Sequence, residues 1–225
     1  MSTASVTVQR VSRLNPKYFV FAFIGMMCAY VLVHNESFLV NPTDPVWRHY
    51  QPFRWWLLPH GLAGACALLL VPMQFSDRLR RRYTKLHRVA GRFYVAGAFI
   101  AAPLGFFIQL FQERLGAPRG FSVASASHAT LWTASTAIAF AFILNGKVQQ
   151  HRQWITRSVV VGPGVFLAGR VIIGITGWEK LGGAAIETVV WVCLAASFFL
   201  ADLILQWEEL WRSRPAPRKA VVAAS

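Results

Sequence analysis

The sequence is short of charge, and of negative charge above all, which excludes several classes of protein. Only 14% of its 225 residues are charged, against about a quarter in ordinary soluble domains, while 55% are hydrophobic. Nine acidic residues stand against 23 basic ones, so the formal net charge is +14. A bilayer span needs about 20 apolar residues, and the chain has room for six such spans with little left over. A large catalytic domain outside the membrane is therefore excluded.

Cysteine and the common catalytic motifs are scarce as well. The three cysteines, Cys28, Cys66 and Cys193, lie in apolar segments without metal-binding spacing and are interpreted as core thiols. The sequence has no HExxH pattern, and its serines and threonines lack a carboxylate partner in a catalytic arrangement. We therefore expect no disulfide framework, no zinc centre and no membrane hydrolase.

Apolar stretches bounded by charged, aromatic, proline or glycine residues predict six transmembrane helices. They cover residues 18–33, 55–75, 93–112, 121–146, 158–178 and 181–206. The first stretch is interpreted as a retained anchor, because it lacks the small-residue pattern of a cleavage site. The predicted fold class is thus an all-α, polytopic membrane bundle. Residues 1–17 form an N-terminal segment, residues 18–207 the six-helix domain, and residues 208–225 a basic tail that we expect to be disordered.

The distribution of lysine and arginine predicts the direction of the spans. Most basic residues lie before the first span, after the second, after the fourth and after the last. This positive-inside bias predicts that both termini are cytoplasmic. Anionic lipid headgroups then account for the positive charge, and nucleic acid is not an expected partner.

Four of the six histidines lie near the starts of four different predicted spans, at two levels of the bilayer. Given the span directions, His60 and His128 lie near the outer face, and His87 and His151 near the inner face. From His60 to the inner end of its span is about 20 Å. Two imidazoles that face each other across a bundle can supply both axial ligands of a b-type haem. The sequence therefore predicts one or two haem b groups with these four histidines as iron ligands.

Small and cationic residues beside the histidines agree with this hypothesis. Gly61 and Gly64 follow His60, and Gly91 follows His87 by one turn, which would leave space for a flat macrocycle. Haem propionates need cations. The candidates are Arg88, Arg92, Arg152 and Arg157 for the inner pair, with Arg48 and Arg54 for the outer one.

Arg170 interrupts the fifth predicted span and has two interpretations. An arginine at this depth costs about 2.5–3.5 kcal/mol on insertion scales. It either pairs with Glu187 of the sixth span, or anchors a ligand group such as an outer haem propionate or a quinone carbonyl. Asp202 is expected to be a solvated interface residue, and Pro163 between two glycines is expected to kink the fifth span.

Two stretches carry a family resemblance. One runs from His60 through residues 68–75 to residues 86–94, and the other comprises residues 132–138 and 151–158. Together they resemble a bacterial family of predicted multi-pass membrane proteins of unknown function, over about residues 20–205. The resemblance implies that the protein lies in the inner membrane of a bacterium. The architecture is also similar to that of the cytochrome b561-type transmembrane cytochromes, whose six helices hold two haems. That resemblance implies that His60 pairs with His128 and His87 with His151, although no ascorbate-site motif is present.

Two classes of function follow. The first is an integral membrane cytochrome, a transmembrane oxidoreductase that takes electrons from quinol or another donor and passes them to an acceptor beyond the outer face. The second is a non-catalytic membrane subunit, or a carrier of small solutes or ions, with structural histidines and a buried pair of Arg170 and Glu187. The lipid bilayer is a partner in both, and a homodimer or a larger membrane complex stays open in either.

Overall fold

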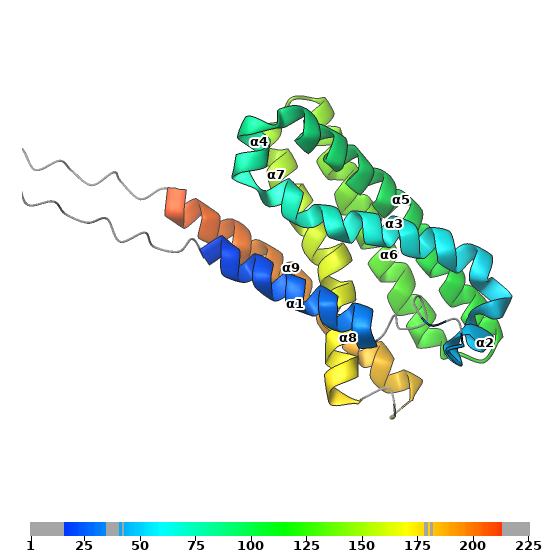
Figure 1. Cartoon of the computed structure of the whole chain (residues 1–225). Coiled ribbons are helices and arrows are strands. Elements are labelled where there is room, and N and C mark those ends of the chain that lie inside the picture. Colours follow the sequence, from blue (N-terminus) through cyan, green and yellow to red (C-terminus); the bar gives the residue numbers. More distant parts are fainter. Residues whose placement is uncertain (1–15, 35–40, 42, 178–179, 181, 213–225) are drawn as a thin grey trace, which may run out of the picture.

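Every regular element of the computed structural model is helical over the residues it describes, which are 16–34, 41, 43–177, 180 and 182–212 (Figure 1). The all-α prediction is therefore confirmed for this part of the chain. Most of the predicted N-terminal segment and of the predicted tail lies outside the described residues. The α-helices are α1 (Pro16–His34), α2 (Val46–Tyr50), α3 (Arg54–Phe75), α4 (Asp77–Arg82), α5 (Thr84–Arg114), α6 (Arg119–Leu144), α7 (Val148–Val159), α8 (Val165–Thr176) and α9 (Gly183–Arg212).

Five helical stretches are long and apolar enough to cross a membrane, and they correspond to the second through sixth predicted spans. They are Trp47–Phe75, Thr84–Arg114, Arg119–Leu144, Val148–Thr176 and Gly183–Trp207. The first predicted span is α1, whose apolar part, Phe19–His34, is shorter. Many large apolar side chains point outward, including Leu62, which is 76% exposed, and Phe199, which is 73% exposed. Such surfaces are stable in lipid and unfavourable in water.

Two helices begin well before the predicted spans. The sequence predicts starts at residues 93 and 158, but α5 begins at Thr84 and the fifth stretch begins at Val148. The residues in between are basic and polar on one face, and no proline or glycine cluster interrupts the helix there. The predicted boundaries were therefore wrong, and His87 and His151 lie inside helices.

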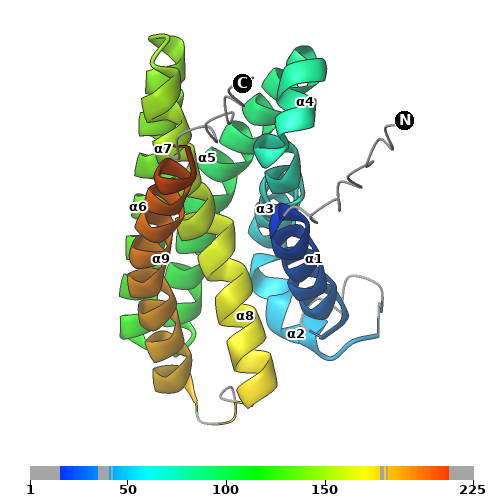
Figure 2. The same ribbon diagram turned by 90° about the vertical axis from the view of Figure 1, so that its left-hand side faces the viewer.

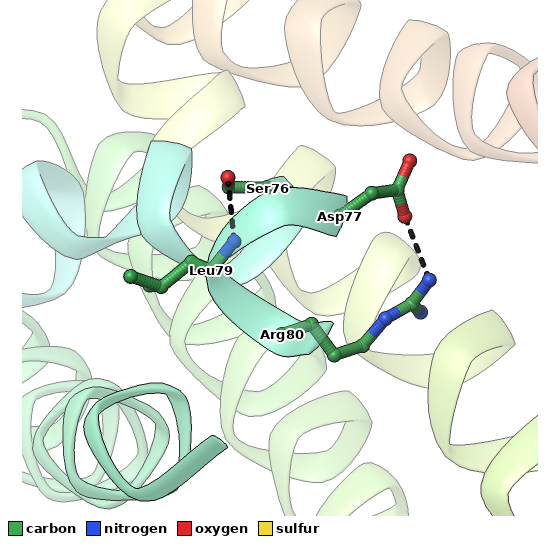
Figure 3. Close-up of polar contacts among 4 residues, drawn as sticks. All are labelled: Ser76, Asp77, Leu79 and Arg80. Atoms are coloured by element: carbon green, nitrogen blue, oxygen red, sulfur yellow. Dashed lines mark hydrogen bonds and ion pairs between the residues drawn. The ribbon is translucent and has the colours of Figure 1, made fainter. Parts of the chain in front are cut away.

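The helices α3 and α5 form an antiparallel hairpin whose backbones approach closely. A Cβ atom on Gly97 of α5 would lie 2.7 Å from the Ala63 carbonyl oxygen of α3 and 3.2 Å from the Ala67 Cβ. Small residues at such a contact allow the close helix packing that is common in membranes. The short helix α4 lies in the connection, where the Ser76 hydroxyl accepts a hydrogen bond from the Leu79 N–H as an N-cap (Figure 3).

A second hairpin consists of α6 and the stretch formed by α7, the π-helical turn η3 (Val160–Gly164) and α8. The interruption predicted around Pro163 is thus a π-helical turn within a longer helical stretch. Such turns occur mostly as single insertions in α-helices, and frequently at functional sites. The Trp132 indole of α6 lies directly on Gly162, where any Cβ atom would collide with the ring.

The remaining long helices flank the second hairpin. In Figure 2, α8 lies between α9 and α1 and contacts both. Gly174 of α8 gives room to the Tyr30 ring of α1, because a Cβ atom there would lie 2.6 Å from the phenolic oxygen. The buried core is shared by α3, α5, α6, η3, α8 and α9.

Candidate functional site

In the first hairpin, each of the two candidate histidines lies against the other helix. The His60 Nδ1–H of α3 donates to the Ala101 carbonyl oxygen of α5 at 2.8 Å. Its ring lies on Gly105, where a Cβ atom would be 2.8 Å from the imidazole Cε1. The His87 Nδ1 of α5 is buried near the Met73 carbonyl of α3 but without hydrogen-bond geometry, so it has no partner among the described residues.

The second hairpin repeats this arrangement. The His128 Nε2–H of α6 donates to the Val161 carbonyl oxygen in the π-helical turn at 2.8 Å, and its ring stacks on Trp132 with the centroids 6.2 Å apart. The His151 Nδ1–H of α7 donates to the Ala139 carbonyl oxygen of α6 at 2.8 Å. Each hairpin therefore holds two imidazoles against the backbone of its own partner helix.

The contacts of Tyr94 show how the two hairpins are aligned. Tyr94 of α5 bonds Ser158 at the end of α7, and His87 and His151 lie about two turns from these residues on the same side. On the other side, His60 reaches α5 about two turns beyond Tyr94. His128 lies one turn beyond Trp132, which also bonds Tyr94. The four histidines thus occupy two levels, which we call the outer level (His60 and His128) and the inner level (His87 and His151).

Between the two levels, four residues form a buried, closed network of hydrogen bonds. The Trp132 Nε1 lies 3.3 Å from the Tyr94 oxygen, which lies 2.8 Å from the Ser158 Oγ. The Ser158 Oγ lies 2.7 Å from the Thr136 Oγ1, which in turn lies 2.7 Å from the Trp132 carbonyl oxygen. Tyr94, Ser158 and Thr136 have no exposed surface. We call these four residues the Tyr94 network.

The chemistry of the groups fixes the donor and the acceptor of every hydrogen bond in the Tyr94 network. A carbonyl oxygen only accepts, so the Thr136 hydroxyl donates to it. The Ser158 hydroxyl must then donate to Thr136, and the Tyr94 hydroxyl must donate to Ser158. The Trp132 N–H donates to the Tyr94 oxygen. Every donor is therefore used, and the network joins α5, α6 and α7 across the interface between the hairpins.

The sequence did not predict the Tyr94 network. It offered hydroxyl residues without a carboxylate partner, which argued only against a hydrolase. A usable signal was the presence of Tyr94, Thr136 and Ser158 within apolar spans, because polar side chains there usually find partners on neighbouring helices.

The cations proposed for haem propionates have varied surroundings. Arg157 forms an ion pair with Asp202 of α9 at 2.7 Å, and its guanidinium lies 5.4 Å from the Trp154 ring centroid. Arg157 is therefore already paired, and Asp202 is exposed but held in an ion pair. Arg88 and Arg92 are exposed, whereas Arg152 is half-buried and makes contacts of its own. At the outer level, Arg48 is exposed, and Arg54 lies over Trp55 with its guanidinium donating to Gln51.

Arg170 and Glu187 do not pair with each other in the described part of the chain. The Arg170 guanidinium lies 5.5 Å from the Phe166 ring centroid and close enough to His60 for its charge to act on the imidazole. The Glu187 carboxylate lies directly on Gly120 of α6. The first interpretation of Arg170 is therefore corrected, because these two side chains face different helices.

The glycines expected to leave space for a macrocycle have other surroundings. Gly61 is exposed, and a Cβ atom added there would meet nothing within 4 Å, while a Cβ atom on Gly64 would face only the Ala101 Cβ at 3.9 Å. Gly91 lies against the Gln74 side chain, whose Nε2 is buried without a partner among the described residues. Gly64 and Gly91 therefore serve the contact between α3 and α5.

The helices and the burial pattern define a polytopic α-helical membrane protein. A family model described as a predicted membrane protein, DUF2306, matches residues 57–205, and the chain belongs to this family. The match spans both hairpins, all four histidines of the two levels and the Tyr94 network. No curated protein and no solved structure matches the chain.

Proposed function

We propose that this protein is a membrane-embedded cytochrome-like electron carrier. The observation that supports the proposal is the common hydrogen bond of His60, His128 and His151, each of which gives one ring N–H to a backbone carbonyl. Such a bond fixes the tautomer and leaves the other ring nitrogen unprotonated, which is the form that binds a metal. Metal-bound histidines almost always have a second partner of this kind.

The residues at the two levels fit this role in different ways. His60 and His151 keep Nε2 as the free nitrogen, whereas His128 keeps Nδ1. Among the described residues, the buried Nδ1 of His87 has no hydrogen-bond partner, which leaves it available to a ligand. His60 with His128 would hold one haem b, and His87 with His151 the other. When bound, haem supplies one-electron redox chemistry, and the protein supplies ligands, orientation and exclusion of water.

Other parts of the chain would support electron transfer between membrane faces. The Tyr94 network holds the two hairpins in register, so that the two histidines of each level stay at the same height. The two levels lie about 20 Å apart along the helices. Arg88, Arg92 and Arg152 provide positive charge at the inner level for propionates or for an anionic donor. Quinol is the donor that a membrane location favours, with an acceptor beyond the opposite face.

The proposal includes the full topology. The 19 residues of α1 span about 28 Å, close to the roughly 30 Å of a hydrocarbon core, so α1 would be a sixth span. The concentration of lysine and arginine on one side supports a cytoplasmic position for both termini. The resemblance to a bacterial family supports a bacterial inner membrane as the location.

A second candidate function is a non-catalytic membrane subunit with structural histidines. The observation that favours it is the packing of Gly64 and Gly97 into the contact between α3 and α5, which gives these small residues a purpose without a macrocycle. In that case the histidine N–H bonds act only as polar contacts between helices.

An absorption spectrum separates the two candidates. The full-length protein, purified in detergent from haem-replete cells, should show a sharp α band in a dithionite-reduced minus oxidised spectrum. His60→Ala and His128→Ala should remove one part of that band, and His87→Ala and His151→Ala the other. His34→Ala is the matched control, because that imidazole is exposed and its hydrogen bond among the described residues is to Tyr30 of its own helix. A wild-type protein without the band, or four variants with unchanged spectra, would favour the structural role.

A further inference from the structure

A groove on the surface of the bundle lies outside both histidine levels. It has a volume of about 610 Å³ and lies between the last turns of α5 and the first turns of α6. Phe106, Leu110 and Glu113 line it from α5, and Arg119, Ser127 and Thr130 are among the residues that line it from α6. Leu110 is 39% exposed, so this surface faces outward from the helices.

The two charged residues of the groove lie at the end next to the connection between α5 and α6. Glu113 is half-buried, and Arg119 is exposed. Neither carboxylate nor guanidinium makes an ion pair within the described residues, although both line the same groove. Two opposite charges that share a groove without neutralising each other suit a ligand that carries both charges.

The rest of the groove is suited to a hydrocarbon chain. Phe106 and Leu110 of α5 face Val123 and Leu131 of α6 along its length. From Arg119 to Leu131 the helix rises by about 18 Å, comparable with half of a hydrocarbon core of about 30 Å. The Ser127 hydroxyl donates to the Val123 carbonyl oxygen of its own helix, so it does not add a free donor among the apolar side chains. The groove is therefore charged at the interface and mainly apolar toward the bilayer centre.

We propose that this groove binds a phospholipid with a zwitterionic headgroup that carries a primary ammonium, namely phosphatidylethanolamine. Arg119 binds the phosphate and Glu113 accepts hydrogen bonds from the ammonium. One acyl chain lies against Phe106, Leu110 and Leu131. A choline headgroup has no N–H to donate to Glu113, and a glycerol headgroup leaves the carboxylate beside a net negative lipid. Phosphatidylethanolamine thus satisfies both charges with a headgroup that has no net charge.

Native mass spectrometry of the detergent-purified, full-length protein tests this assignment. The protein is delipidated and titrated separately with phosphatidylethanolamine, phosphatidylcholine and phosphatidylglycerol. We expect the wild type to retain phosphatidylethanolamine about tenfold better than phosphatidylcholine, the effect of one charge-assisted hydrogen bond. Glu113→Gln should remove that preference, and Arg119→Gln should weaken the binding of all three lipids.

Arg114→Gln is the matched control, because Arg114 is an exposed arginine next to Glu113 that does not line the groove. It should leave the lipid preference unchanged. Equal retention of the three lipids by the wild type, a preference for phosphatidylglycerol, or an unchanged preference in Glu113→Gln would each overturn the proposal. None of these outcomes depends on haem, so the test is independent of the proposed function.

Discussion

The contact between α3 and α5 makes a sharp prediction about two glycines of the same hairpin. At Gly97, a Cβ atom would lie 2.7 Å from the Ala63 carbonyl oxygen and 3.3 Å from the Ala67 backbone nitrogen. Both neighbours are backbone atoms of α3, so they can give way only if the two helices move apart. At Gly61, a Cβ atom would meet nothing within 4 Å. Gly97→Ala and Gly61→Ala therefore make the same chemical change in opposite surroundings.

The two substitutions should change the free energy of unfolding in opposite directions. Replacing a helical glycine with alanine gains up to about 1 kcal/mol, because glycine loses more backbone entropy. Gly61→Ala should therefore stabilise the protein by a few tenths of a kcal/mol up to about 1 kcal/mol. Overpacking at Gly97 costs about 1–3 kcal/mol. After a helix gain of about 1 kcal/mol is subtracted, Gly97→Ala should destabilise the protein by up to about 2 kcal/mol.

Equilibrium unfolding in mixed micelles measures both effects on the full-length protein. The fraction of folded protein is followed against the mole fraction of denaturing detergent, and the midpoints and slopes give the two differences in free energy. The expected order of stability is Gly61→Ala, then wild type, then Gly97→Ala. If Gly97→Ala were as stable as Gly61→Ala, α3 and α5 would not be in backbone contact at this position.

Two further predictions concern the polar contacts. Tyr94→Phe leaves the Trp132 N–H without its acceptor and should lower the free energy of unfolding by about 1–2 kcal/mol. The exposed control, Tyr83→Phe, should leave the free energy of unfolding unchanged. Equal effects of the two substitutions would contradict the buried hydrogen-bond network. Arg157→Gln and Asp202→Asn should each lower the melting temperature slightly, and a double-mutant cycle should give a coupling of under about 1 kcal/mol for this partly exposed pair. Strict additivity would show that the ion pair contributes nothing.

The sequence predicted the spans better than it predicted their ends. Hydropathy located five stretches that the structure confirms, because an apolar run of sufficient length has few alternatives to a membrane helix. The beginnings at Thr84 and Val148 were missed, since basic and polar residues there continue a helix that hydropathy alone does not detect. The DUF2306 match confirms the predicted resemblance to a family of membrane proteins over residues 57–205.

The contacts within the candidate site were harder to predict than its levels. The direction of each span was enough to expect two levels of histidine. The partner of each imidazole was not predictable, because His60 and His128 bond backbone carbonyls that any residue could provide. Arg157 was assigned to a cofactor, but it reaches Asp202 of another helix, a contact that depends on how α7 and α9 pack.

The most direct test of the proposed electron carrier is the haem content of the full-length protein. Haem b is counted by the pyridine haemochrome method on protein purified from haem-replete cells, with the chain quantified by amino-acid analysis. We expect about two haems per chain, one for each histidine level, and a loss of about one in His60→Ala. A wild-type protein with no haem would contradict the proposed function and leave the four imidazoles as contacts between helices.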